Sequence, residues 1–165
     1  MFRRSLIVAL LLLAISVAAY AAEPQKPSQS DKCAVCGMLV APHSKWLSQI
    51  IFKDGTAVFF DGPKDMFKFY FDIPKHAPKK TLADVSDIYV TDYYSAKTVK
   101  AQDAVFVIGS DVMGPMGKEF VPVSQDKVKN FMVDHKGAKA LKFDEIKAAD
   151  FHSNDMDKSH SDHHH

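Results

Sequence analysis

An order of hydrophobic patterns that occurs twice limits the folds open to this chain more than any other feature. Apolar residues first alternate with less apolar ones from Trp46 to Phe52, and after an Asp54-Gly55 turn a second apolar run covers residues 56–60. A period of two predicts strands, and Asp-Gly between two such runs predicts a hairpin. We therefore expect two antiparallel strands here.

The period then becomes helical. A helix is predicted from Pro63 to about Ile73, with Asp61 or Gly62 available to cap its start. Residues 88–91 predict a third strand. The apolar face of the predicted helix consists of Met66, Phe67, Tyr70 and Ile73.

The second half repeats this order with different residues. Strands are predicted at 104–108 and 119–123, and Pro122 places the second of them at a sheet edge or at its own end. A helix follows, with Ser124 as its cap and Gly137 as its C-terminal glycine. The face of this helix carries Val128, Phe131, Met132 and His135.

A closing strand is predicted at 140–143, so each half has the order strand, strand, helix, strand. The fold class expected is therefore α+β, with two similar strand-strand-helix-strand units. We place the first unit at 33–97 and the second at 98–147.

The first 21 residues have the features of a secretory signal peptide. Arg3 and Arg4 precede an apolar run at 5–17, and Ala19-Tyr20-Ala21 matches a small-x-small cleavage site. The run is shorter than the roughly 20 residues of a spanning helix, so an uncleaved anchor is the less favoured alternative. We expect cleavage near Ala21 and a periplasmic location, without lipoprotein processing, because no cysteine lies at the cleavage point.

Two polar segments flank the predicted units. Residues 22–32 contain two prolines and few apolar side chains, which favours a solvated tether. Residues 148–165 form a predicted flexible tail that holds five of the eight histidines. Such tracts bind divalent metals weakly, and we leave this tail out of the predicted site.

Charge and motifs exclude several classes of function. Without the two arginines of residues 1–21, 19 Lys and Arg face 20 Asp and Glu, and no basic-aromatic stripe is present, so a nucleic-acid partner is not expected. The chain also lacks a nucleophile elbow, a phosphate loop and a His-Glu-x-x-His motif. We therefore expect neither an enzyme nor a small-molecule substrate.

Sulfur side chains are concentrated in two glycine-containing loops. Cys33-Ala-Val-Cys36-Gly-Met38 holds both cysteines, and Met113-Gly-Pro-Met116-Gly117 follows about eighty residues later. Thiolates and thioethers together favour Cu(I), whereas zinc rarely takes methionine and harder cations require oxygen. The two loops are predicted to meet and to hold one Cu(I). The candidate ligands are Cys36, Met38, Met116, Cys33, Met113 and His43.

Other interpretations of the cysteine pair stay open. A local disulfide is one, although closing so short a loop adds little stability. An exported thiol-disulfide oxidoreductase or redox sensor that uses Cys33 and Cys36 is another, but such pairs open a helix after a buried strand, and here a polar segment precedes the pair. An exported binding module without a metal is a third.

Five fragments, in order, resemble the NosL family, the accessory proteins of nitrous oxide reductase maturation. The resemblance runs roughly from Cys33 to Ile146. It implies two similar strand-strand-helix-strand units and one Cu(I) bound outside the cytoplasm. The implied partners are the membrane-associated copper-assembly machinery of nitrous oxide reductase or the reductase itself. The fragments are Cys36-Gly37-Met38, Phe59-Phe60-Asp61, Tyr89-Val90-Thr91-Asp92, the strand 104–110 and Met116-Gly117.

The resemblance also suggests which side chains bind the metal. The thiolate and thioether ligands of the family correspond to Cys36 and Met38, and its later Met-Gly loop corresponds to Met116. This chain departs from the usual pattern in two respects. Cys33 adds a second thiol, and the lipoprotein cysteine of many members is missing, which suggests a freely diffusing protein.

Overall fold

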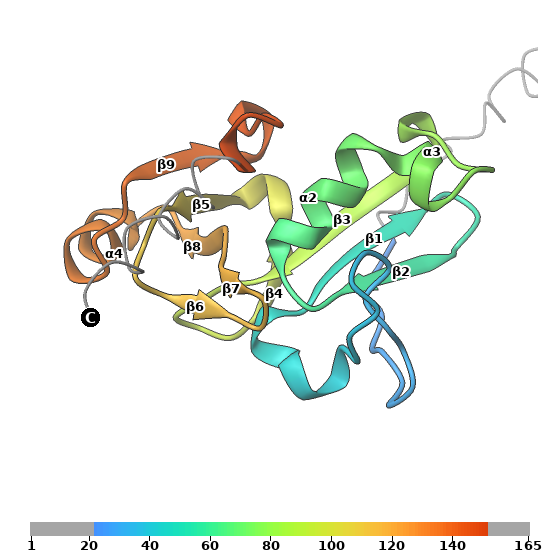
Figure 1. Cartoon of the computed structure of the whole chain (residues 1–165), viewed down its shortest axis with the longest axis horizontal. Coiled ribbons are helices and arrows are strands. Elements are labelled where there is room, and N and C mark those ends of the chain that lie inside the picture. Colours follow the sequence, from blue (N-terminus) through green and yellow to red (C-terminus); the bar gives the residue numbers. More distant parts are fainter. Residues whose placement is uncertain (1–21, 152–165) are drawn as a thin grey trace, which may run out of the picture.

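Two antiparallel sheets lie side by side in the computed structural model of the chain, with short helices packed on them (Figure 1). The structure describes residues 22–151 of the 165. The predicted signal peptide and the histidines of the predicted tail lie outside the described residues. None of the helices within 22–151 is long and apolar enough to cross a membrane.

The first sheet has the strand order β2-β1-β3-β4. Its strands are β1 (Ser48–Phe52), β2 (Ala57–Phe60), β3 (Val85–Thr91) and β4 (Thr98–Lys100). The predicted hairpin is confirmed, because β1 and β2 pair antiparallel across a turn in which Gly55 has φ +83°. Trp46 does not belong to β1. It ends a preceding 3-10 helix, η1 (Ala41–Trp46).

Helix α2 (Pro63–Phe71) covers one face of this sheet and confirms the helix predicted after Pro63. Helix α2 packs on β1 and β2, and Met66 and Phe67 of its predicted apolar face are fully buried in the main core. Phe67 also reaches the second half, with its ring centroid 4.9 Å from that of Phe106. Pro74 lies in the first turn of a separate short helix, α3 (Ile73–His76), because proline cannot donate the hydrogen bond that would continue α2.

The second sheet repeats the topology of the first. Its order is β8-β5-β9, with β5 (Ala104–Ile108) in the centre, as β1 is between β2 and β3. The outer strands are β8 (Val121–Ser124) and β9 (Lys139–Lys142), and α4 (Val128–Asp134) lies between them in the chain. The repeated strand-strand-helix-strand order is thus confirmed. Pro122 lies in an edge strand, as expected.

Three details differ from the sequence-based expectation. Strand β4 pairs with β3, so the first sheet extends beyond residue 97. A hairpin of β6 (Met113–Gly114) and β7 (Gly117–Lys118) is inserted between β5 and β8, and the strand expected from 119 begins at Val121. The remaining 3-10 turns are η2 (Leu82–Asp84), η3 (Ala101–Asp103) and η4 (Phe143–Glu145).

The ends of α4 also differ. Its N-cap is Lys127, without a side-chain cap, so Ser124 does not cap it. The residue with a left-handed backbone after its last turn is Lys136, with φ +54°, and not Gly137. Gly137 follows it, and its N–H donates a hydrogen bond to the Met132 carbonyl at 3.0 Å. Gly137 is required for space, because a Cβ there would lie 2.5 Å from Val107 Cγ1.

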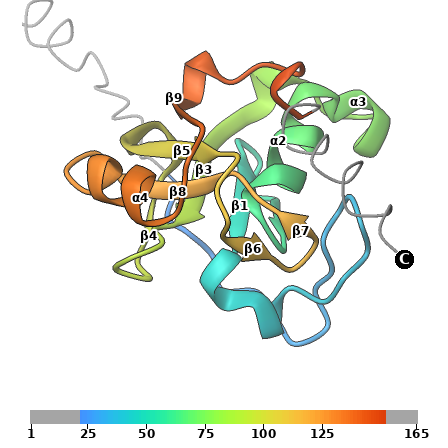
Figure 2. The same cartoon turned by 60° about the vertical axis from the view of Figure 1, so that its left-hand side comes forward.

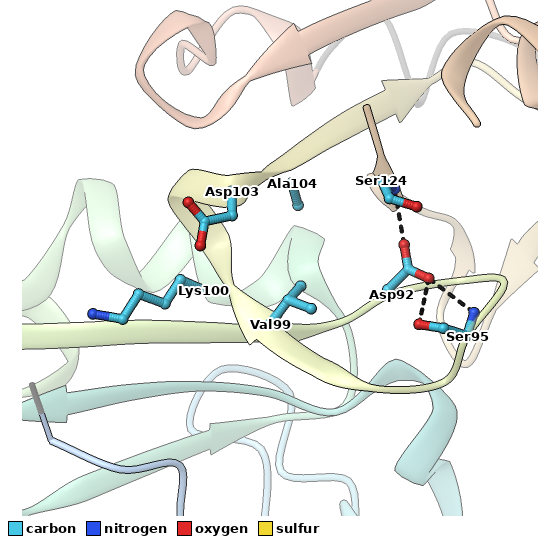
Figure 3. A pocket seen from close by; sticks show the side chains of 7 residues that line it. All are labelled: Asp92, Ser95, Val99, Lys100, Asp103, Ala104 and Ser124. Carbon is cyan, nitrogen blue, oxygen red and sulfur yellow. Dashed lines mark hydrogen bonds between the residues drawn. The ribbon is translucent and has the colours of Figure 1, made fainter. Parts of the chain in front are cut away.

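The two sheets are joined where β3 ends. One carboxylate oxygen of Asp92 accepts hydrogen bonds from the Ser95 amide and hydroxyl, and the other accepts one from the Ser124 amide of β8 at 2.8 Å (Figure 3). The Tyr93 N–H also donates to the Pro122 carbonyl, at 2.9 Å. A hollow of about 240 Å³ lies beside this junction.

The described ends of the chain are packed more closely than expected. Residues 22–32 have little regular structure and are mostly exposed, but Ala22 and Gln25 make hydrogen bonds to the first sheet. The fold also continues past residue 147. Phe151 stacks on Phe120 with ring centroids 5.1 Å apart, and the buried carboxylate of Asp150 accepts a hydrogen bond from Lys139.

Candidate metal site

The cysteines lie in a tight loop that is closed at its base by backbone hydrogen bonds. The Cys33 N–H donates to the Met38 carbonyl at 2.7 Å, and the Gly37 N–H donates to the Cys33 carbonyl at 2.9 Å. Gly37 has φ +77°, a conformation that side-chain-bearing residues rarely adopt. A further bond, from the Ala34 N–H to the Phe59 carbonyl, holds the loop against β2. The loop therefore has a fixed position beside the end of β2.

Two carboxylates meet the thiols at this position. Asp61 follows β2 directly and Asp65 lies in the first turn of α2. The Cys36 thiol donates to Asp61 Oδ1 at 3.3 Å, and the Cys33 thiol donates to Asp65 Oδ2 at 3.5 Å. One ligand atom from each of these four residues lies within 4.8 Å of the other three. Both thiols are free, so the local disulfide is not formed.

The two thiols differ in their surroundings. Cys33 is only 2% exposed and belongs to the main core, whereas Cys36 is exposed. Burial raises the pKa of the Cys33 thiol far above its usual value, and the adjacent Asp61 carboxylate adds to this effect. Burial also raises the pKa of Cys36. Without a metal, both groups are therefore neutral thiols at neutral pH.

The chemistry of this group fits a metal ion. Asp61 Oδ2 is buried and has no hydrogen-bond partner among the described residues, so a donor atom with a free lone pair faces the protein interior. Asp65 is partly neutralised by Lys68, whose Nζ lies 3.0 Å from Oδ1. The start of α2 adds a positive partial charge that favours anionic side chains such as thiolates. Two sulfur and two carboxylate donors thus converge on one point.

The methionine hairpin β6–β7 is anchored to the same end of α2. Glu119, directly after the hairpin, is buried, and its Oε1 accepts the Lys64 N–H at 2.7 Å. The Lys64 Nζ donates to the Lys118 carbonyl, also at 2.7 Å. In both views the hairpin projects from the second sheet toward the start of α2 (Figures 1 and 2). The hairpin and the cysteine loop are therefore both held by the first turn of α2.

The remaining predicted ligands lie in the cysteine loop, the hairpin and η1. Met113 and Met116 are exposed on the hairpin, at 60% and 47%, and neither is a core gap-filler. Met38 is half-buried at the base of the cysteine loop. His43 is half-buried in η1 and is not among the residues within 4.8 Å of one another.

Comparison with known proteins identifies the family. The sequence model of the family described as NosL matches residues 24–151. The chain belongs to the NosL family. No curated protein matches the chain.

Two solved structures of NosL proteins are similar to this one. The crystal structure of the copper chaperone NosL from Shewanella denitrificans has a TM-score of 0.64 and 26% identity, over 78% of this chain and 98% of that one. The solution structure of apo-NosL from Achromobacter cycloclastes has a TM-score of 0.45 and 24% identity, over 62% of this chain and 86% of that one. The first of these confirms a NosL-like α+β fold.

Asp61 and Asp65 are the members of the site that sequence reasoning missed. In this NosL chain the two residues are four apart at the start of a helix. Asp61 was expected as a helix cap and as part of the Phe59-Phe60-Asp61 fragment, not as a member of the site. The spacing is a weak signal by itself, because paired carboxylates are common in first helical turns. It becomes informative only when the cysteine loop is known to lie beside the end of β2.

Proposed function

We propose that this NosL protein binds Cu(I) outside the cytoplasm and delivers it for the assembly of nitrous oxide reductase. The similar protein from Shewanella denitrificans is described as a copper chaperone, and the family assignment supports the same role here. The proposed recipients are the membrane-associated copper-assembly machinery or the reductase itself. Neither step requires catalysis by this protein.

The observation that carries the proposal is the meeting of both thiols at the first turn of α2. Thiolates and thioethers favour Cu(I) over harder cations, and the methionine hairpin is anchored to the same turn. The proposed ligands are Cys36 and Met38 from the cysteine loop and Met116 from the hairpin, with Cys33, Met113 and His43 as further candidates. Before the ion binds, Asp61 and Asp65 hold the thiols in place through the hydrogen bonds described above.

Differences in exposure support delivery by ligand exchange. Cys36 is exposed and Met116 is 47% exposed, so a sulfur from a partner can approach the ion from this side. Cys33 is buried and would keep its bond while the exposed ligands are replaced. A partner ligand can then add before a protein ligand leaves, which avoids release of a free copper ion.

The alternative function, an exported thiol-disulfide oxidoreductase or redox sensor, is less well supported. Redox-active cysteine pairs contain a thiol with a lowered pKa, because the thiolate is the nucleophile. Here burial raises the pKa of both thiols. Neither cysteine therefore provides the thiolate that a redox-active pair needs as its nucleophile. The alternative predicts insulin reduction that survives the loss of Met38 and Met116.

A competition titration with a coloured Cu(I) chelator tests the proposal on the reduced protein. We expect Cys36→Ala to weaken Cu(I) binding about 100-fold, equivalent to about 2.7 kcal/mol, and Met116→Leu to weaken it about tenfold. Met132→Leu is the matched control, since Met132 lies half-buried on α4 and its loss should leave the affinity unchanged. Unchanged affinity in Cys36→Ala would refute the assignment.

A second measurement addresses the recipient. In cells that lack their own chaperone gene, the wild-type protein should restore copper to nitrous oxide reductase, and Cys36→Ala should not. Copper content of the purified reductase is the readout. Restoration by both proteins would contradict delivery through this site.

A further inference from the structure

The segment 22–28 is attached to the first sheet at two of its residues, Ala22 and Gln25. The Gln25 N–H donates to Gln49 Oε1 at 2.8 Å, and the Gln49 amide donates back to the Gln25 carbonyl at 3.1 Å. The Gln25 amide also reaches the Gly55 carbonyl, at 3.1 Å. A glutamine of β1 thus pairs with the backbone of this segment much as a neighbouring strand would. We call residues 22–28 the N-terminal arm.

The arm lies on the face of the sheet opposite α2. Ile50 and Ile88 face the core under α2, so their neighbours Gln49, Ile51 and Tyr89 point to the other face. These three side chains are nevertheless at most 7% exposed, and Ile51 is fully buried although it belongs to neither core cluster. The arm, which bonds to Gln49 and Tyr89, supplies the cover for this face.

The first described residue, Ala22, occupies a polar site built by β3. Its backbone nitrogen donates to Asp87 Oδ2 at 2.7 Å, and its carbonyl accepts a hydrogen bond from the Tyr89 hydroxyl at 2.8 Å. The Asp87 side chain is only 9% exposed and also accepts hydrogen bonds from Lys100 Nζ at 2.9 Å and Ser86 Oγ at 2.8 Å. A nearly buried carboxylate therefore faces the nitrogen of one particular residue.

The sequence marks the same residue by an independent argument. Ala19-Tyr20-Ala21 places the expected cleavage of the signal peptide between Ala21 and Ala22, because small residues are required one and three positions before the cut. Cleavage one residue later would put Tyr20 at the position that requires a small residue. The nitrogen that cleavage would free is the nitrogen that Asp87 contacts.

We propose that cleavage after Ala21 creates an α-ammonium group at Ala22 and that Asp87 and Tyr89 form its binding site. An endopeptidase of the export pathway hydrolyses the Ala21–Ala22 peptide bond. Water supplies the hydroxyl to the Ala21 carbonyl and a proton to the Ala22 nitrogen, and the free amine takes a further proton from solvent. The amide hydrogen bond to Asp87 thereby becomes an ion pair.

This assignment concerns how the N-terminal arm is fixed and does not depend on copper binding. The new ammonium is charged near the sheet surface, where Asp87 favours it and Lys100 and Glu23 are the other charged groups in the vicinity. Charge-assisted hydrogen bonds are shorter and stronger than neutral ones. Processing would thus strengthen the attachment of the arm that covers Gln49 and Ile51.

The first test is the intact mass of the full chain after expression and export in a bacterial host. We expect a mature protein that begins at Ala22. A mature protein that begins at another residue, or one that retains residues 1–21, overturns the cleavage site.

The second test measures the rate at which an acylating reagent modifies the α-amino group of the exported protein at pH 7, read by peptide mass mapping. An ordinary α-amino group has a pKa of about 7.7–8.0, and each unit by which an ion pair raises it slows acylation about tenfold. We expect about tenfold slower acylation in the folded protein than in the same protein unfolded in urea. Equal rates overturn the binding site.

Two variants assign the protection to Asp87. We expect Asp87→Asn to acylate about tenfold faster than the wild type, while Asp72→Asn, which alters an exposed carboxylate between α2 and α3, keeps the wild-type rate. If Asp87→Asn fails to fold, Tyr89→Phe removes the hydrogen bond to the Ala22 carbonyl and should also speed acylation. Wild-type rates in both folded variants overturn the proposal.

Discussion

Glu119 is expected to make the stability of this protein depend on pH in a direction that is unusual for a carboxylate. Its side chain is 3% exposed, and its Oε1 accepts the N–H groups of Lys64 at 2.7 Å and of Phe120 at 3.2 Å. Burial raises the pKa of Glu119 from 4.5 to about 8. The folded protein therefore holds a neutral acid near pH 7, whereas the unfolded chain holds a carboxylate.

The sign and size of the effect follow from this difference. Between about pH 4.5 and pH 8 the folded state keeps a proton that the unfolded state has lost, so the free energy of unfolding decreases as pH rises. The slope is about 1.4 kcal/mol per pH unit, and the contribution is complete below about pH 4.5 and lost above about pH 8. From pH 5 to pH 7 the loss is roughly 3 kcal/mol, a large part of the typical stability of a domain.

The variant Glu119→Gln keeps the shape of the neutral acid but cannot ionise. Urea unfolding of both proteins at pH 5, 6 and 7 gives the free energy of unfolding, and the wild-type value minus the variant value should fall by roughly 3 kcal/mol across this range. Other ionisable groups are common to both proteins, so they cancel in this difference. A flat difference would mean that Lys64 keeps Glu119 ionised, and the reasoning from burial would be refuted.

Three further predictions concern glycine positions and thiol protonation. Gly62→Ala should lower the free energy of unfolding by about 2 kcal/mol, because the new Cβ would clash with Glu119 Oε2. Urea unfolding should show a smaller decrease when the same substitution is made in a Glu119→Ala background, and an unchanged decrease would exclude this clash. Lys136→Gly should raise the free energy of unfolding by about 1 kcal/mol, because Lys136 has φ +54°, while Lys129→Gly inside α4 should lower it by about as much; the same sign for both would contradict this. Burial keeps the thiols of Cys33 and Cys36 protonated in the metal-free protein, so each thiol must lose a proton when it binds Cu(I). In chelator competition at pH 6 and 7, the Cu(I) affinity should rise about tenfold per pH unit for each thiolate that binds. An affinity that does not change with pH would exclude thiolate ligation.

The larger elements could be predicted from the sequence because each carries its own local signal. The Asp54-Gly55 turn and the apolar runs around it define the β1–β2 hairpin, and Pro63 marks the start of α2. The strands β4, β6 and β7 have only two or three residues, too few for a period of two to be recognised. The position of the N-terminal arm could not be predicted from the sequence either, because its hydrogen-bond partners come from strands that are distant in the sequence.

The candidate site was predictable only in part, for a related reason. The softness of sulfur distinguishes the cysteine loop and the methionine hairpin from the rest of the sequence. Asp61 and Asp65 look like ordinary residues of a helix start, and only the packing of the cysteine loop beside β2 gives them a second role. Which of the sulfur atoms bind the ion stays a prediction.

The edges of the second sheet also have a consequence for how this protein behaves at high concentration. An outer strand with free N–H and C=O groups can pair with a strand of another molecule and start aggregation. Pro122 has no N–H to offer, and its carbonyl already accepts the Tyr93 N–H. On the opposite edge, β9 ends at the exposed Lys142, whose charge disfavours a second copy of the same strand, while Lys139 is paired with Asp150. Both edges thus carry features that disfavour intermolecular pairing, which should help to keep the protein monodisperse at high concentration.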